Sequence, residues 1–151
     1  MKLKPLLRYH ADLKPPVDVG KGPYGTRQIF EVTGGSFEGE RLKGTILTGG
    51  GDWILIDDRG VGHLDVRATF RTHDGAHIYL QYYGSLVINE KVQKALGAGG
   101  STEYGDTSFF TAPRFETGDE RYAWLNDVVA VAEGRVLPGA VEYRVYECVN
   151  D

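Results

Sequence analysis

Carboxylates next to aromatic residues are the first candidates for chemistry in this chain. Asp52 is followed by Trp53, and Glu116 follows Phe115. A carboxyl group in an apolar, aromatic pocket has a raised pKa and can move protons near neutral pH. Asp52 and Glu116 are therefore candidate catalytic acids or bases on opposite sides of one cavity. A structural interpretation competes, because aspartate often caps a glycine turn and Glu116 could pair with a nearby arginine.

A second candidate pair lies two residues apart on one predicted strand. Asp65 and Arg67 share a face of that strand and could hold a polar ligand together. The planar guanidinium of arginine suits a carboxylate or an enolate oxygen, so Arg67 is a candidate catalytic residue that stabilises an oxyanion. Alternation alone leaves a second interpretation open. The same face could be a solvated outer row, which its neighbours Thr69 and Arg71 favour.

Metal and cofactor chemistry have little support in the sequence. His73 and His77 bracket the Asp74-Gly75 turn, but a metal ligand at such a turn would face solvent. The single cysteine, Cys148, excludes an internal disulfide and a multi-cysteine zinc site, and it fits a packed core position in the last strand. We expect no metal and no cofactor.

One glycine motif imitates a dinucleotide-binding site. Residues 20–25 match the pattern G-x-G-x-x-G. That motif binds a pyrophosphate only between a buried strand and the N-terminus of a helix. Here a proline-rich turn precedes it and a predicted strand at 27–33 follows it. We interpret the segment 17–24 as a wide loop.

The segment from Leu47 to Gly84 must position most of these side chains. It predicts three strands joined by two tight turns, at residues 58–60 and 74–75, because Asp and Gly tolerate the turn conformations of hairpins. In the middle strand Leu64 to Phe70 alternate with the polar row His63 to Arg71, the period of a half-buried strand. The third strand has tyrosines on both faces, which suggests that one of them lines a cavity.

The rest of the chain predicts more short strands and one helix. Asn89 can cap a helix that ends near Gly97. A glycine-rich loop follows at 98–106. In total we expect about nine to ten strands and an all-β, mostly antiparallel barrel, with further strands at 6–13, 27–33, 107–117, 127–133 and 141–149.

Composition limits the class of protein. The 151 residues fit a single domain, 1–151, that is long enough to bury a core. Seventeen basic and 21 acidic residues give a net charge of −4, which argues against non-specific nucleic-acid binding. We see neither a signal peptide nor a membrane-spanning run, and therefore expect a cytoplasmic protein that does not bind a membrane.

The valine-rich segment Val128 to Val131 predicts a self-association surface. Both faces of this strand are apolar. One face can line the barrel, and the other then needs a second covering surface. We expect a homodimer.

Several short motifs, spread in order over nearly the whole chain, resemble one family. They are Gly25-Thr26-Arg27, Gly34 to Gly39, Gly49 to Trp53, Leu64 to Arg67, Asp74-Gly75-Ala76, Tyr83-Gly84, Phe115-Glu116-Thr117 and Trp124-Leu125-Asn126. This pattern is similar to that of the bacterial and fungal domain of unknown function 3237 family. The resemblance implies a single barrel like those of calycins and allene oxide cyclases, and it implies no general activity. It also favours an inward-facing row from His63 to Arg67.

Three functions remain open at this point. The first is a cofactor-independent isomerase, cyclase, lyase or hydratase acting on a small, mostly apolar molecule with a carbonyl or carboxylate. The second is a carrier with the same cavity and no catalysis, and the third is a structural subunit with a filled barrel. For either ligand hypothesis we expect the ligand-binding residues to be Tyr9, Trp53, Asp65, Tyr83, Trp124 and Asn126.

Overall fold

The computed structural model describes all 151 residues except the side chain of Ala98. It contains one α-helix, α1 (Glu90–Ala98), and one 3₁₀ segment, η1 (Glu120–Asp127). The rest of its regular structure is strands: β1 (Lys2–Leu13), β2 (Val17–Gly22), β3 (Gly25–Gly39), β4 (Lys43–Ile46), β5 (Gly51–Asp52), β6 (Leu55–Ile56), β7 (Val61–Thr72), β8 (His77–Val87), β9 (Phe109–Thr111), β10 (Arg114–Glu116), β11 (Ala130–Leu137) and β12 (Ala140–Val149).

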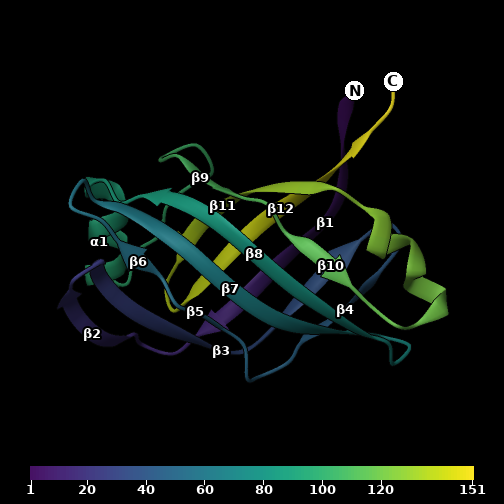
Figure 1. Cartoon of the computed structure of the whole chain (residues 1–151), viewed down its shortest axis with the longest axis horizontal. Coiled ribbons are helices and arrows are strands. Elements are labelled where there is room, and N and C mark those ends of the chain that lie inside the picture. Colours follow the sequence, from purple (N-terminus) through teal and green to yellow (C-terminus); the bar gives the residue numbers. More distant parts are fainter.

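The strands close into an antiparallel barrel, as predicted (Figure 1). The order runs β1, β3, a position shared by β4, β5 and β6, then β7, β8, β9, β11 and β12, which pairs with β1 again. This is a ring of 8 strands. A closed ring leaves the barrel without the unpaired edges that expose backbone hydrogen-bonding groups.

The β7–β8 hairpin is the longest pairing and follows the predicted alternation. It runs without interruption from the pair Val61 and Val87 to the pair Arg71 and His77. Gly75 turns the chain with a φ of 92°, a backbone conformation that favours glycine. The side chain of Asp74 accepts a hydrogen bond from the Thr72 hydroxyl, which stabilises the turn.

Large side chains fill one half of the barrel. Phe37 and Phe70 stack with ring centroids 4.7 Å apart, and Tyr9 meets Phe70 edge-on at 5.3 Å. Ile78 and Leu80 are fully buried beside them. This half of the interior is a packed core.

The two helical segments lie at opposite ends of the barrel (Figure 1). Asn89 caps α1 as predicted, accepting a hydrogen bond from the backbone of Val92. Val92 and Ala95 are the buried face of α1. None of the helices that the structure describes is long and apolar enough to cross a bilayer.

Some predicted element boundaries are wrong. Residues 17–22 form β2, which pairs with β3, where we expected a loop. The strand expected at 27–33 is part of the longer β3, which continues through the glycines at 34–35. At Gly35 a side chain would collide with the His10 carbonyl oxygen of β1, so this glycine permits a close approach of two strands. The predicted strand 107–117 is divided into β9 and β10.

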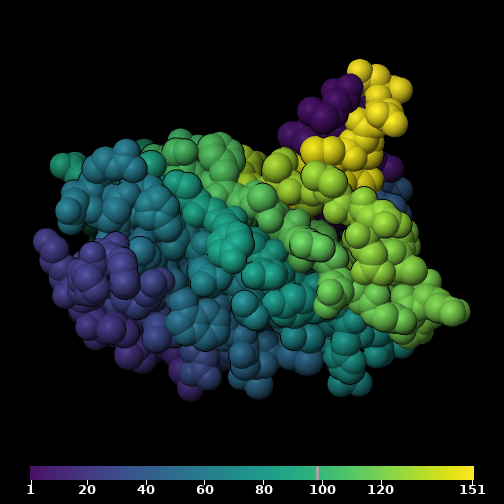
Figure 2. All heavy atoms as spheres, viewed as in Figure 1, coloured from purple at the N-terminus to yellow at the C-terminus, as the bar shows by residue number. Residues whose placement is uncertain are grey.

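The chain termini project from the barrel as a two-stranded ribbon, which Figure 2 shows at its upper right. Lys2 pairs with Val149, and Leu3 with Cys148. Cys148 is only half-buried there, so the expected core position for its thiol is wrong.

Candidate functional site

A cavity of about 520 Å³ lies at the end of the barrel where α1 packs. Its rim includes the turn at Pro15-Pro16, the turn at Gly139, and Leu96 of α1. Most of its wall is apolar and comes from β3, β6, β7, β8, β9, β11 and β12 and from the residues next to β6 and β8. The apolar lining residues include Phe30, Ile54, Ile56, Leu64, Leu86, Ile88, Phe109, Val136 and Val141. Volume and lining are those of a small-molecule site.

Asp52 is the carboxylate of this cavity. In β5 it stands opposite Phe30 of β3 and Val66 of β7, so its side chain shares their inward face. One of its oxygens, Oδ1, accepts a hydrogen bond from the backbone N–H of Asp65 at 3.1 Å. No salt bridge joins Asp52 to a cation in the part of the chain that the structure describes. The structure places Asp52 in the wall of this cavity, and its catalytic role stays a prediction.

The surroundings of Asp52 favour its protonated form. Burial raises the pKa of the carboxyl from 3.8 to about 6, and the negative charge of Asp65 acts in the same direction. The hydrogen bond from the Asp65 backbone opposes this shift. A carboxyl with a pKa near 6 can both accept and return a proton at neutral pH.

Three buried tyrosines lie beside Asp52 inside the barrel. Tyr143 also lines the cavity, and its ring centroid is 4.8 Å from that of Tyr9 and 5.6 Å from that of Tyr82. Burial raises the pKa of each phenol, and the charge of Asp52 raises it further. All three hydroxyls therefore stay protonated and are able to donate hydrogen bonds. The Tyr9 hydroxyl is buried without a hydrogen-bond partner among the described residues.

Together these groups can carry out proton transfer on a bound molecule. Asp52 supplies a base of suitable pKa, and the Tyr143 hydroxyl supplies a donor for an oxygen that gains negative charge. An aspartate base combined with a tyrosine donor in an apolar site is the arrangement by which ketosteroid isomerase enolises a ketone.

Arg67 does not belong to this site. Its side chain is exposed on the outer face of β7, between the inward-facing Val66 and Ala68. The expectation of an inward-facing row from His63 to Arg67 is therefore wrong, and the solvated outer row is correct. Asp65 is half-buried on the same outer side and reaches the cavity only through its backbone N–H, which binds Asp52.

Glu116, Trp124 and Asn126 lie at the other end of the barrel. Glu116 is exposed on β10 and is not part of the cavity wall, so the structure does not pair it with Asp52. The Asn126 amide holds the backbone of Thr117 through two hydrogen bonds of 2.8 and 2.9 Å. Trp124 lies under the guanidinium of Arg41 at 3.9 Å. None of the three residues lines the cavity.

The remaining predicted ligand-binding residues are divided between inside and outside. Tyr9 is inside, behind Tyr143. Tyr83 is 64% exposed on the outer face of β8, because its neighbour Tyr82 takes the inward position. Trp53 is 38% exposed, and its ring covers Gly51. The backbone carbonyl oxygen of Trp53 accepts a hydrogen bond from the Arg27 guanidinium.

The histidine pair at the β7–β8 turn does not converge on a metal site. Asp74 accepts hydrogen bonds from the Thr72 and Tyr122 hydroxyls, while His73 and His77 are exposed. Within the described residues, no group of three His, Cys, Asp or Glu side chains is placed to hold a metal ion.

The site residues predicted from the sequence do not include Tyr82 and Tyr143, which lie beside Asp52 inside the barrel. Tyr82 alternates with Leu80 and Ile78, the apolar row of β8, and that row marks the inward face. Tyr143 alternates with Val141 and Val145 in the same way. Sharing a face with the aliphatic residues of a strand favours an inward position for both tyrosines, but this signal does not locate the cavity.

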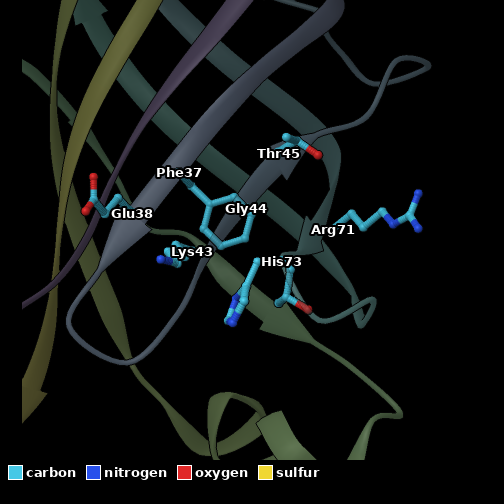
Figure 3. Close-up of a pocket in the computed structure, with 8 residues that line it drawn as sticks. Phe37, Glu38, Lys43, Gly44, Thr45, Arg71 and His73 are labelled. Atoms are coloured by element: carbon cyan, nitrogen blue, oxygen red, sulfur yellow. The ribbon is translucent and has the colours of Figure 1, made fainter.

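A second hollow lies on the outer surface at the filled end of the barrel (Figure 3). It is lined by the β3–β4 hairpin and the end of β7, and its volume is about 470 Å³. Glu38 and Arg71 point away from each other there, and His73 lies beside Phe37 (Figure 3). The polar groups of this hollow do not converge on one point, so it is a weaker candidate than the inner cavity.

Known bacterial proteins share this architecture over almost their entire length. A beta-barrel-like protein of Acinetobacter baumannii is 37% identical, with a TM-score of 0.81 over 97% of this chain and 94% of the other. The structure of RPA1785 from Rhodopseudomonas palustris, a protein of unknown function, gives a TM-score of 0.91 at 26% identity, covering 98% and 97% of the two chains. By sequence, the UPF0311 protein RPA1785 is 33% identical over 67% of this chain, and the match spans 66% of that relative, just under two thirds of its length.

A fungal relative extends the comparison. The PR-toxin biosynthesis cluster protein 7 of Penicillium roqueforti is 28% identical, over 78% of this chain and 74% of that protein. The family model for proteins of unknown function DUF3237 matches residues 1–148. With this match over nearly the whole length, the chain belongs to the DUF3237 family.

Proposed function

We propose that this protein is a cofactor-independent enzyme of the isomerase, cyclase, lyase or hydratase type. Its substrate is a small, mostly apolar molecule with a carbonyl or carboxylate group, bound in the barrel cavity. The observation that carries this proposal is the position of Asp52, a carboxyl with a pKa of about 6 beside Tyr143 in an apolar cavity. The fungal relative named for a biosynthesis cluster supports a role in small-molecule chemistry.

The proposed step is a proton transfer next to a carbonyl group. Ionised Asp52 takes a proton from the carbon beside the carbonyl. The C–H electron pair forms a carbon–carbon double bond, and the carbonyl π electrons move onto oxygen. The Tyr143 hydroxyl donates a hydrogen bond to that oxygen, and the carbonyl re-forms as protonated Asp52 returns the proton. The proton returns to the same carbon or, where a second double bond is conjugated with the enolate, to the far carbon of that double bond, which shifts the double bond. Isomerisation by this route needs no oxidant, reductant or metal.

The assignment of roles differs from the one expected from the sequence. Arg67 was the candidate for holding the oxyanion, and Glu116 for sharing proton transfer with Asp52. Both are exposed outside the cavity. In the proposed mechanism the phenol of Tyr143 replaces the arginine, and Asp52 acts both as base and as acid.

Deuterium exchange tests catalysis without a known substrate. Enolisable bicyclic ketones such as 2-tetralone are incubated with the protein in D₂O, and exchange is followed by NMR. We expect the protein to accelerate exchange, and Asp52→Asn to reduce that acceleration by a factor of about 10²–10⁴. Tyr83→Phe, on the outer face, is the matched control for Tyr143→Phe.

The alternatives predict different results. Bound ketone without accelerated exchange would favour the non-catalytic carrier. A structural subunit with a filled barrel conflicts with the cavity of about 520 Å³. Equal exchange by the native protein and Asp52→Asn would refute the assignment of the base.

A further inference from the structure

The cavity wall contains two charged residues, one at the rim and one inside the barrel. Among its lining residues only Lys14 and Asp52 carry charge. Lys14 belongs to the turn at the rim, and its side chain is 58% exposed. The Lys14 Nζ lies 2.9 Å from Oε2 of Glu31. Asp52 is enclosed by the barrel. The interior therefore holds a negative group, and the one lysine of the wall is already paired.

The groups that face Asp52 add no positive charge. Tyr9 of β1, Tyr82 of β8 and Tyr143 of β12 are neutral phenols, and Asp65 of β7 is acidic. A carboxylate ligand bound in this space would bring a second negative charge close to Asp52 at low dielectric. Like charges in such a site repel strongly, and neither finds a counter-ion.

A neutral carbonyl oxygen is not repelled by Asp52 and can accept a hydrogen bond in this cavity. Tyr143 is the one tyrosine that lines the cavity, and its ring contacts those of Tyr9 and Tyr82 on the side of the packed core. Its hydroxyl stays protonated and can donate a hydrogen bond, while the rest of the wall and the rim are largely apolar. A ligand with one polar end gains a hydrogen bond when that end enters first, and its apolar body is buried against the wall. The reverse orientation would leave the Tyr143 donor facing hydrocarbon.

We propose that the cavity selects uncharged ketones or enones of two-ring size, bound with the carbonyl innermost, and rejects carboxylates of the same skeleton. This inference rests on the proposed function, because it concerns the same site. It narrows the carbonyl-or-carboxylate class to the neutral carbonyl. A cavity of about 520 Å³ is large enough for such a molecule.

A matched series of naphthalenes tests this selectivity. The probes are 2-acetylnaphthalene, 2-naphthoate and 2-ethylnaphthalene, titrated calorimetrically at about pH 8, where Asp52 is ionised. We expect the ketone to bind most tightly and the carboxylate at least about tenfold more weakly. Equal or tighter binding of the carboxylate would overturn the proposal, as would no binding by any of the three.

Two variants assign the selectivity to its residues. In Asp52→Asn the carboxylate should regain most of its lost affinity, whereas Asp58→Asn, an exposed turn carboxylate, should leave the order unchanged. In Tyr143→Phe the ketone should weaken toward the level of 2-ethylnaphthalene, while Tyr83→Phe keeps the native difference. Circular dichroism confirms folding of each variant. Selectivity that survives both cavity substitutions would overturn the proposal.

Acid provides the same test without a mutation. At about pH 5 most Asp52 is protonated in the free protein, so the discrimination between ketone and carboxylate should narrow. Binding is measured here without turnover, which separates this inference from the proposed enzyme. Ketone selectivity without deuterium exchange would leave the selectivity standing and refute catalysis. Deuterium exchange of ketones together with tighter binding of carboxylates would support catalysis and refute the proposed selectivity.

Discussion

Because Asp52 is buried, we predict that its ionised carboxylate lowers the free energy of unfolding of the protein. The pKa of the group is 3.8 as a free side chain and about 6 in the folded barrel. The folded state therefore holds the proton more tightly than the unfolded state. Below about pH 4 both states are protonated and the burial has no ionic cost. As the pH rises from about 4 through 6, the unfolded state ionises first, and folding becomes less favourable.

The size of the effect follows from the same two values. The difference between about 6 and 3.8, at about 1.4 kcal/mol for each pH unit, corresponds to about 3 kcal/mol above pH 7. Asp52 keeps partial solvent contact through the cavity, so we expect between about 1 and 3 kcal/mol. Asp52→Asn removes the charge and keeps an oxygen that can accept the hydrogen bond from the Asp65 backbone.

Urea unfolding at several pH values measures this cost. The free energy of unfolding of Asp52→Asn should exceed that of the native protein by about 1–3 kcal/mol at pH 8, and the difference should fall toward zero near pH 4. Asp58→Asn should change stability by no more than about half a kcal/mol at either pH. A stability difference for Asp52→Asn that is independent of pH, or that favours the native protein at pH 8, would refute the reasoning. A gain in stability with loss of exchange activity is typical of a catalytic group.

Three further predictions concern residues outside the cavity. Because Arg67 is exposed, Arg67→Ala should shift unfolding by no more than about half a kcal/mol and leave ketone binding intact, and a calorimetric titration showing lost binding would contradict its outer position. Arg41 binds the buried Glu147 at 2.7 Å, so Arg41→Ala should cost on the order of 2 kcal/mol in urea unfolding, and an unchanged midpoint would show that the pair contributes nothing. Val129 and Val131 are 68% and 39% exposed on one outer surface, and we predict that they form a homodimer interface. Sedimentation should then show a dimer that Val131→Lys converts to a monomer, whereas a 16.7 kDa species at all concentrations would exclude it.

Strand type and turn chemistry could be recognised from the sequence. The alternation of β7, the Asp74-Gly75 turn and the Asn89 cap each depend on contacts within a few residues, and all three are present. The family resemblance predicted the closed barrel, which the pairing of β12 with β1 confirms. The glycines at 34–35 in β3 are ambiguous in the sequence, because a glycine that admits a neighbouring strand has the same sequence signal as one that turns the chain.

Which face of each strand points inward was decided only by the tertiary structure. Period-two alternation divides a strand into two rows without saying which row is inside. In β7 the polar row, with Arg67, faces solvent, and in β8 the choice between Tyr82 and Tyr83 depends on closure of the barrel. The environment of Asp52 comes from strands distant in the sequence, since Tyr9 and Tyr143 belong to the first and last strands of the ring. The sequence by itself shows an aspartate beside an aromatic residue, whereas its raised pKa and its phenol neighbours arise from long-range packing.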